Sequence, residues 1–182
     1  MNQKQNWLES NMTKIVFERL TNVQMPSRAH ATDAGLDFYI PADLNYVLQH
    51  GKNINVGLYT RNMEPTNDII TSAAIEIRPH ESCLIPMGIK CKFEDGRALV
   101  FFNRSGVSTK KHLLRGACVV DSPYRGEIFV NMNNVSNETQ YLLPGEKLIQ
   151  ALLLPIFTPE VEEGKIENDT DRGEGGFGST GA

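Results

Sequence analysis

Residues 147–154 read KLIQALLL, and almost every residue in this stretch is apolar. On its pattern alone, the stretch could form a buried helix or a buried strand. Its short length favours a strand, and so do the turn formers at its ends, Pro144-Gly145 before it and Pro155 after it. We therefore expect a strand here.

Short β-rich runs recur over the rest of the chain, and no long stretch shows the 3.6-residue period of an amphipathic helix. In residues 127–133 (EIFVNMN), for example, Ile128, Val130 and Met132 alternate onto one face. The other expected strands are residues 14–20 (KIVFERL), 73–77, 83–85 and 98–102 (ALVFF). Turn formers separate these runs. Regularly spaced short strands predict an all-β sandwich, jelly roll or barrel.

The composition excludes several classes of protein. A chain of 182 residues fits one domain of ordinary size. Lys and Arg number 18 and Asp and Glu 22, so the net charge of −4 argues against a nucleic-acid partner bound through bulk charge. The longest apolar run, residues 149–157, is interrupted by Pro155 and is too short for a membrane helix.

The cysteines and the N-terminus bear on the compartment. Cys83, Cys91 and Cys118 are odd in number, and their spacing fits neither a disulfide scaffold nor a zinc site. The first ten residues lack the apolar core of a secretory signal. We expect reduced thiols in a cytoplasmic protein, or in the host cytoplasm if the chain is viral.

Two regions depart from the rhythm of short strands. Residues 43–71 are polar and predict a long surface excursion with a short helix near residues 44–49. Residues 160–182 open acidic and end RGEGGFGSTGA, so they have little to bury. We expect a barrel domain over residues 1–159, with an insertion near 43–71, and a flexible arm over residues 160–182.

The arm carries the most informative motif. Arg172 offers a forked donor for phosphate, and the glycines around it let backbone N–H groups converge on an anion. Phe177 is a lone aromatic residue that could stack on a planar base. The plain alternative is a flexible Gly/Ser tail.

Four further segments offer chemistry, although each also has an ordinary structural interpretation. They are TDAGLDF (32–38), NRSGVS (103–108), GACVVDSPYRGE (116–127) and GEKLIQ (145–150). The second fits a phosphate grip or a polar turn. In the third, Asp121 follows an apolar strand and could act as a general base in a dry cleft, or could cap a hairpin turn. The first fits a turn near a cation, and Gln150 in the last needs polar partners.

Together and in this order, the five segments resemble the trimeric dUTPase family. The resemblance implies a jelly-roll-like β-barrel and a homotrimer with three shared active sites. It also implies hydrolysis of dUTP to dUMP and pyrophosphate with Mg²⁺. At two positions the sequence departs from the family pattern: Arg115 and Cys118 stand where relatives often have Gly or Asn. Asn103 replaces a Pro or similar residue, a change from which we expect little consequence.

The resemblance also implies a role for each matching residue. Asp121 would deprotonate the attacking water, and Asp37 would anchor a water on Mg²⁺. Tyr124 would lie under the deoxyribose, and the hairpin from residue 116 to 124, with Cys118 and Val120, would read the uracil edge. The expected phosphate and nucleotide contacts are Arg104, Ser105, Gly106 and Gln150 from the barrel, and Arg172, Phe177, Gly178, Ser179 and Thr180 from the arm.

Two other functions remain open from the sequence. One is a dCTP deaminase or bifunctional relative on the same barrel, although no Glu lies between Leu99 and Asp121 to move protons at the base. The other is a dUTPase-like regulatory protein that binds a protein partner through the 43–71 insertion and the arm.

Overall fold

A computed structural model describes residues 14–63 and 68–175. Its central sheet has four antiparallel strands in the order β2-β12-β7-β9. These strands are β2 (Leu36–Tyr39), β12 (Lys147–Pro155), β7 (Arg97–Asn103) and β9 (Val119–Asp121). The register places Gln150 opposite both Asp37 and Phe102. The strand predicted at residues 147–154 is therefore confirmed, and it lies between β2 and β7 in the sheet.

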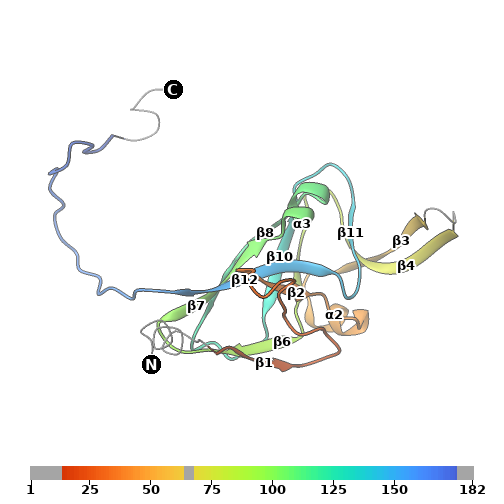
Figure 1. Ribbon diagram of the computed structural model, residues 1–182. Helices are drawn as coiled ribbons and strands as arrows, with labels where there is room; N and C mark the ends of the chain where they lie inside the picture. The colour runs from red at the N-terminus through yellow and green to blue at the C-terminus, as the bar shows by residue number, and fades with distance from the viewer. Residues whose placement is uncertain (1–13, 64–67, 176–182) are drawn as a thin grey trace.

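Three smaller antiparallel sheets complete the barrel (Figure 1). One joins β5 (Ser82–Pro86), β10 (Phe129–Asn134) and β8 (Leu113–Arg115), and another joins β1 (Val16–Arg19) and β6 (Ile89–Lys92). The third joins β11 (Gln140–Leu142), β4 (Asp68–Ile77) and β3 (Asn55–Met63). Strand accounts for 43% of the structure and helix for 8%, so the predicted all-β class is confirmed.

Alternating apolar side chains build the core between the sheets. Val130 and Met132 on β10 are buried, whereas Asn131 between them is only partly buried. The ring of Phe38 packs edge-on against Phe17 and Phe101, with ring centroids 5.7 and 5.0 Å apart. This pattern is expected of an antiparallel sheet with one face on the core. The core fixes the strand register and therefore decides which side chains meet on the outside.

Residues 43–71 form a surface excursion, as predicted, but with more regular structure than the one expected helix. The short helix is confirmed as α2 (Leu44–His50), which begins at the Asp43 carboxylate, an acceptor for the Asn45 backbone N–H at 2.9 Å. The strands that follow it were not predicted: β3 and β4 pair as a long two-stranded ribbon that projects from the barrel (Figure 1). The polarity of the region hid its alternation of exposed and half-buried residues.

The segment after β7 also differs, because NRSGVS does not continue as a turn. Residues Ser105–Lys110 form the helix α3, with Arg104 at its N-cap position. After β12, the Ile156 backbone N–H donates to the Gly96 carbonyl at 2.9 Å, and residues 155–174 are then all exposed. The arm runs away from the barrel (Figure 1). No helix within the described residues has the length and apolar character of a membrane span.

Candidate active site

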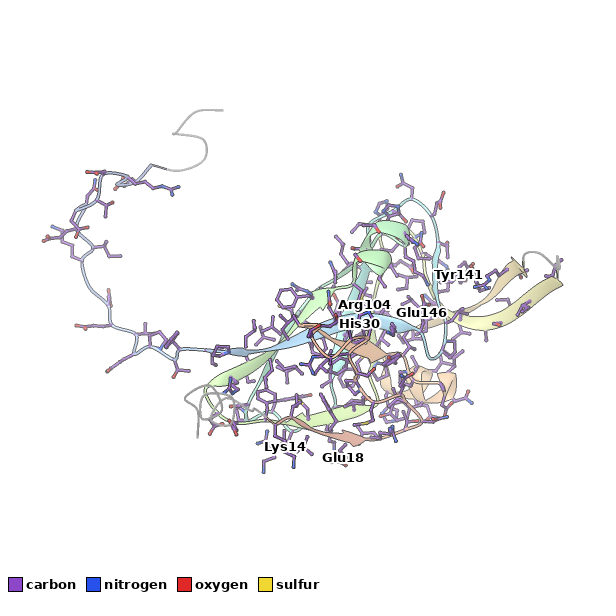
Figure 2. All side chains as sticks on the ribbon, viewed as in Figure 1. Lys14, Glu18, His30, Arg104, Tyr141 and Glu146 are labelled. Carbon is purple, nitrogen blue, oxygen red and sulfur yellow. The ribbon has the colours of Figure 1, made fainter. Side chains whose placement is uncertain are left out.

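Three of the five segments line one pocket of about 360 Å³. The pocket forms because β2 and β7 flank β12, so that the ends of the three segments converge. Arg104 lies at the junction of β7 and α3 (Figure 2). The lining residues are Ala29, Asp33, Ala34, Gly35, Asp37, Arg104, Ser105 and Gln150. The structure thus brings together Asp37, Arg104, Ser105 and Gln150, as the sequence predicts.

A carboxylate between two cations dominates the pocket. Asp37 is 9% exposed, and its Oδ1 atom lies 2.8 Å from the Nε of Arg104. Its Oδ2 atom lies 2.9 Å from the Nζ of Lys147. The hydrogen bond with Asp37 raises the pKa of Lys147 above its ordinary value. Asp33 also lines the pocket, so Arg104 and Lys147 face two carboxylates and the pocket has no excess of positive charge.

The sequence did not predict that Lys147 contacts Asp37, because this contact depends on an irregularity in strand β12. In a regular strand, residues three apart point to opposite faces. The register shifts between Lys147 and Ile149, so Lys147 lies opposite Tyr39 while Gln150 lies opposite Asp37. This bulge lets Lys147 reach Asp37. The only sequence signal was the presence of Lys147 in the GEKLIQ segment.

Gln150 is held by the backbone of the neighbouring strand. Its Nε2 atom donates to the Asn103 carbonyl at 2.9 Å. Gly35 packs directly against the amide, since a Cβ atom at this position would lie 2.6 Å from the Gln150 Oε1 atom. By contrast, a Cβ at Gly106 would meet no atom within 4 Å. Gln150 therefore has a structural partner, and the α3 start at Gly106 faces open space.

Asp121 does not lie in this pocket. It is opposite Ala98 on β7, whereas Arg104 follows Asn103 at the other end of the same strand. The five residue steps from 98 to 103 correspond to about 17 Å. Asp121 is exposed, and no ion pair joins it to another described residue. The dry cleft expected around Asp121 is therefore absent from the single chain.

The segment from residue 116 to 124 is not a hairpin with mutually paired arms, which corrects that expectation. Its strand β9 pairs with β7, and the preceding β8 pairs with β10, so the chain crosses from one sheet to another. Cys118 is half-buried, and its carbonyl accepts from Phe101 N–H at 2.7 Å. The Val120 side chain packs on the core, so only its backbone faces outward.

Tyr124 stands at the turn after Asp121. Its hydroxyl donates to the Glu127 carbonyl at 2.7 Å, and its backbone N–H donates to the Asp121 carbonyl at 3.1 Å. The ring is 44% exposed, and a Cβ atom on Gly126 would clash with it. The Arg125 guanidinium donates to the Ser122 and Tyr124 carbonyls. The turn is thus tightly held, and it presents an open aromatic face.

The arm is described as far as residue 175. Arg172 is exposed, and its Nε atom donates to the Gly175 carbonyl at 2.9 Å. Phe177, Gly178, Ser179 and Thr180 lie outside the described residues. Arg172 does not line the pocket, and the described part of the arm that carries it runs away from the barrel (Figure 1).

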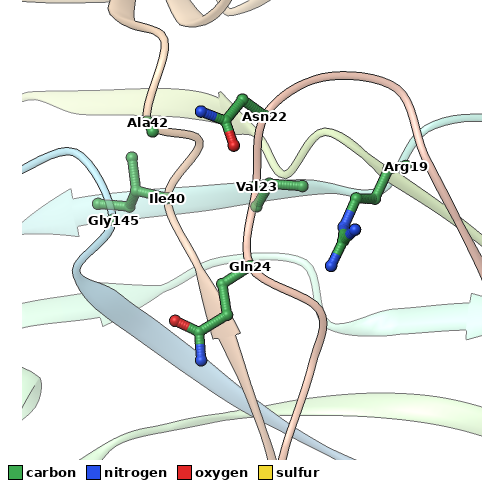
Figure 3. Close-up of a pocket in the computed structure, with 7 residues that line it drawn as sticks. All are labelled: Arg19, Asn22, Val23, Gln24, Ile40, Ala42 and Gly145. Carbon is green, nitrogen blue, oxygen red and sulfur yellow. The ribbon is translucent and has the colours of Figure 1, made fainter.

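The candidate site is not the larger cavity of the molecule, and no cluster of acidic side chains among the described residues marks it. A larger cavity, of about 420 Å³, is lined by Arg19, Asn22, Val23, Gln24, Ile40, Ala42 and Gly145 (Figure 3). It shares only Gly145 with the five segments. Among the described residues, no group of three or more His, Cys, Asp or Glu side chains could hold a metal ion. The chain therefore offers no metal cage of its own in residues 14–63 and 68–175.

Arg104 and Ser105 offer hydrogen-bond donors in a pocket at the edge of an all-β barrel, and such donors fit an enzyme that acts on a phosphate-bearing ligand. The family model named dUTPase matches residues 66–181, and the chain belongs to the dUTPase family. Its activity is that of a deoxyuridine 5′-triphosphate nucleotidohydrolase, EC 3.6.1.23.

Two curated relatives illustrate the similarity. The deoxyuridine 5′-triphosphate nucleotidohydrolase of Finegoldia magna is 37% identical over 113 residues, which cover 61% of this chain and 79% of the relative. The enzyme of the same name from Anaplasma marginale is 29% identical over 175 residues, which cover 93% of this chain and 99% of the relative. The hydrolase prediction is therefore confirmed, and the deaminase alternative gains no support.

Solved structures share the fold. The dUTPase of Staphylococcus bacteriophage 80alpha with dUpNHpp superposes with a TM-score of 0.69 at 23% identity, covering 93% of this chain and 99% of that one. The D95N mutant of the dUTPase from phage phi11 of S. aureus, described with a structural Mg(II) ion, gives a TM-score of 0.62 at 21% identity. The match covers 86% of this chain and 99% of that one. The dUTPase family uses Mg²⁺.

Proposed function

We propose that this chain hydrolyses dUTP at sites assembled between copies of the chain, with Asp121 of one copy acting on a triphosphate held by Arg104 of another. The observation that carries this proposal is the separation of these two residues along β7, by about 17 Å. One α-phosphorus cannot lie beside both residues of a single chain. A second copy supplies the missing half.

The outer face of the central sheet supports an assembly of copies. Strand alternation puts Asp37 and Gln150 at one end of this face and Asp121 at the other. Between them lie the apolar side chains of Val100, Phe102, Val119 and Leu152, of which Val119 is 58% exposed. An apolar strip of this kind is typical of a surface that a second subunit covers. We propose the homotrimer implied by the family resemblance.

The pocket would hold the phosphates. Arg104 and Lys147 supply positive charge, and Ser105 and Gly106 open helix α3 beside them. Asp37 and Asp33 balance this charge, so a bound triphosphate would compete with Asp37 for Arg104. We propose Arg104, Ser105, Gly106 and Gln150 as phosphate contacts, with the Gln150 amide also tied to Asn103.

The residues present fit Mg²⁺ brought in by the substrate. Magnesium keeps several waters and often binds through phosphates and one or two carboxylates, which suits a site without a cluster of acidic side chains. Asp37 would hold the ion through a water, since both carboxylate oxygens already face cations. The bound ion would neutralise charge on the triphosphate.

Asp121 would act as the general base. Its carboxylate takes a proton from a water whose oxygen bonds to the α-phosphorus, and the bond from that phosphorus to the bridging oxygen of the β-phosphate breaks. The products are dUMP and pyrophosphate. Asp121 is exposed in the single chain, so packing of a second copy would exclude bulk water from it.

Nucleotide recognition would come from the segment around Asp121 and from the arm. The exposed ring of Tyr124 would lie under the deoxyribose, and the backbone near Cys118 and Val120 would read uracil. Arg172 would pair with the terminal phosphate, and Phe177, Gly178, Ser179 and Thr180 would cover the nucleotide. The division into a barrel (1–159) and an arm (160–182) belongs to this proposal.

Mixing two inactive variants tests the shared site. Asp121→Asn and Arg104→Ala should each abolish most dUTP hydrolysis when assembled alone. Co-refolded at equal amounts, they should regain about a quarter of the wild-type rate, because random assembly pairs an intact Asp121 with an intact Arg104 at that frequency. Mixed oligomers without recovered activity would show that each chain has a complete site.

A regulatory partner is a second candidate, favoured by the ribbon of β3 and β4. Leu58 on β3 and Ile69 on β4 lie on the same uncharged face of the ribbon. Leu58 is 72% exposed and Ile69 is 69% exposed. Such side chains often mark a protein contact. The double variant Leu58→Ser with Ile69→Ser should keep dUTP hydrolysis within about twofold, since exposed positions contribute little to the fold. Loss of the oligomer in this variant would place the ribbon in the assembly instead.

A cytoplasmic location is also part of the proposal. Cys83, Cys91 and Cys118 are free, and Cys83 and Cys91 are buried. Unpaired thiols are usual in a reducing compartment.

A further inference from the structure

Asn103 joins the phosphate pocket to the segment that contains Asp121. On one side, its carbonyl accepts the hydrogen bond from the Gln150 Nε2 atom at 2.9 Å. On the other side, its Oδ1 atom accepts from the Arg115 backbone N–H at 2.9 Å. Asn103 is the last residue of β7. Its side chain also holds Arg115, the residue before Gly116, in place.

The neighbouring Phe102 completes the contact with Arg115. The Arg115 guanidinium carbon lies 5.6 Å from the centroid of the Phe102 ring, within the range of a cation–π interaction. The NH1 atom of Arg115 donates to the Gly116 carbonyl at 3.2 Å. We call Phe102, Asn103 and Arg115 the clamp. It holds both the backbone and the side chain of Arg115.

The Nε atom of Arg115 is buried and has no hydrogen-bond partner among the described residues. A buried donor without a partner is costly and is rare in stable structures. The ring of Phe102 and the Gly116 carbonyl hold this side chain in place, and the Asn103 amide holds its backbone N–H, although one of the guanidinium donors is unsatisfied. Such a position is typical of a residue whose placement is constrained by function.

The remaining restraints on the segment are main-chain hydrogen bonds. Gly116 N–H donates to the Asn131 carbonyl at 2.9 Å, and the Cys118 carbonyl accepts from Phe101 N–H at 2.7 Å. The Asn131 amide fills the space that a Cβ atom on Gly116 would need. These bonds persist in most variants. The Asn103 amide, in contrast, is a side chain that one substitution removes.

In place of the little consequence expected from Asn at this position, we propose that Asn103 is a positioning residue for base recognition, because its amide fixes the start of the segment that reads uracil. The inference rests on the proposed function of residues 116–124. Uracil differs from cytosine at one exocyclic group and from thymine by one methyl group, so a small displacement of backbone donors and acceptors weakens discrimination. The phosphate pocket itself keeps Arg104 and Lys147, which do not depend on the Asn103 side chain.

Binding of two product fragments separates base recognition from phosphate binding. Calorimetry on the assembled protein would use dUMP as the base-bearing probe and inorganic pyrophosphate as the phosphate probe. In Asn103→Ala, the Kd for dUMP should rise about tenfold, as the loss of one well-placed hydrogen bond predicts, while the Kd for pyrophosphate stays within about twofold. The KM for dUTP should rise with little change in kcat, and the preference for dUTP over dTTP should fall.

Two matched variants make the result specific. In Asn103→Asp a carboxylate oxygen can still accept from the Arg115 N–H, so dUMP binding should return to within about threefold of wild type. Asn137→Ala removes an exposed side-chain hydrogen bond to His80, in a loop outside the clamp, and should leave dUMP binding unchanged. Both variants should fold with nearly the wild-type melting temperature.

Several outcomes would overturn the inference. It fails if Asn103→Ala binds dUMP like wild type, if both probes weaken in parallel, or if Asn103→Asp behaves like Asn103→Ala. If the wild-type protein hydrolyses dUTP but does not bind dUMP, the assignment of uracil reading to residues 116–124 is itself wrong. The wild-type measurement therefore distinguishes that failure from a failure of the clamp.

Discussion

Lys111 and Glu146 form a two-pronged ion pair between helix α3 and the turn that precedes β12. The Nζ atom of Lys111 lies 2.6 Å from Oε1 and 2.8 Å from Oε2 of Glu146, and it also donates to the Tyr141 carbonyl at 2.8 Å. Glu146 in turn accepts from Leu143 N–H at 3.0 Å. Both side chains are less than one third exposed. The pair fixes α3, which begins beside Arg104, relative to the strand that carries Gln150.

Lys111→Met should destabilise the protein and loosen the phosphate pocket. Removing Lys111 leaves the Tyr141 carbonyl and the Glu146 carboxylate without their shared partner, at a cost of about 1–2 kcal/mol. The melting temperature should fall by about 5 °C, and the Kd for pyrophosphate should rise. Lys110→Met is the matched control, since Lys110 is exposed and in none of the ion pairs of the described residues. Equal effects of the two variants would contradict the role of the ion pair.

Gly35→Ala should impair catalysis more than folding. A Cβ atom at Gly35 would lie 2.6 Å from the Gln150 Oε1 atom, so the amide must move and its hydrogen bond to the Asn103 carbonyl weakens. We expect kcat/KM for dUTP to fall about tenfold, as displacement of a positioned polar group predicts. Gly164→Ala, at a position with open space around the Cβ, should change neither rate nor stability. Steady-state kinetics would check both variants, and a wild-type rate for Gly35→Ala would show that Gln150 is not needed at this place.

The buried thiols predict a loss of stability at high pH. Burial raises the pKa of Cys83 to about 12 and that of Cys91 to about 11, from 9.0 in the unfolded chain. The protonated thiols therefore contribute their full stabilisation below pH 9, and this contribution disappears as the pH rises through 11 and 12. Urea unfolding between pH 8 and pH 11 should show a falling midpoint. Cys83→Ala should flatten that fall, and an unchanged slope would contradict the assignment to Cys83.

The same burial predicts the pattern of alkylation. Iodoacetamide at pH 8 should modify half-buried Cys118 first and leave Cys83 and Cys91 intact in the folded protein, because both of those thiols are buried and protonated. Peptide mass mapping against time would measure the order. Early labelling of Cys83 would mean that β5 opens readily.

Removal of residues 172–182 should reduce activity without unfolding the barrel. Residues 155–174 are exposed, so their loss removes little buried area from the single chain. We expect the rate of dUTP hydrolysis to fall by more than about a hundredfold, since closure over the substrate would be lost, while the melting temperature changes by less than about 2 °C. A large drop in melting temperature would show that the arm is part of the stable assembly.

The sequence was a good guide to the strands that form the core. The run at 147–154 was identifiable because it is apolar throughout and ends at Pro155, and residues 127–133 because their apolar residues alternate. Strand β3 was missed because a two-stranded ribbon outside the core needs no such pattern, and Gly57 interrupts its short apolar pieces. Helix α3 was missed because it is a six-residue helix that starts at Ser105-Gly106.

The sequence predicted which segments form the candidate site, but not how their side chains are arranged in space. The sequence indicated Asp37, Arg104 and Gln150, and the structure places them around one pocket. The contact of Lys147 with Asp37 depends on a bulge, and that of Asn103 with Arg115 depends on the approach of two strands that are separate in sequence. Such contacts are decided by register, which short-range patterns do not encode. The distance of Asp121 from Arg104 follows from the same register.

Strand β7 sets the spacing between Asp121 and Arg104, and this constrains how the chain can change over evolutionary time. Lengthening the strand by two residues would keep the inward and outward pattern but push its ends about 7 Å further apart, so that Asp121 and Arg104 would no longer meet across the proposed assembly of copies. The β3–β4 ribbon lies outside this spacing and is free to grow or shrink. Insertions and deletions among descendants of this chain should therefore accumulate in the ribbon and be purged from β7.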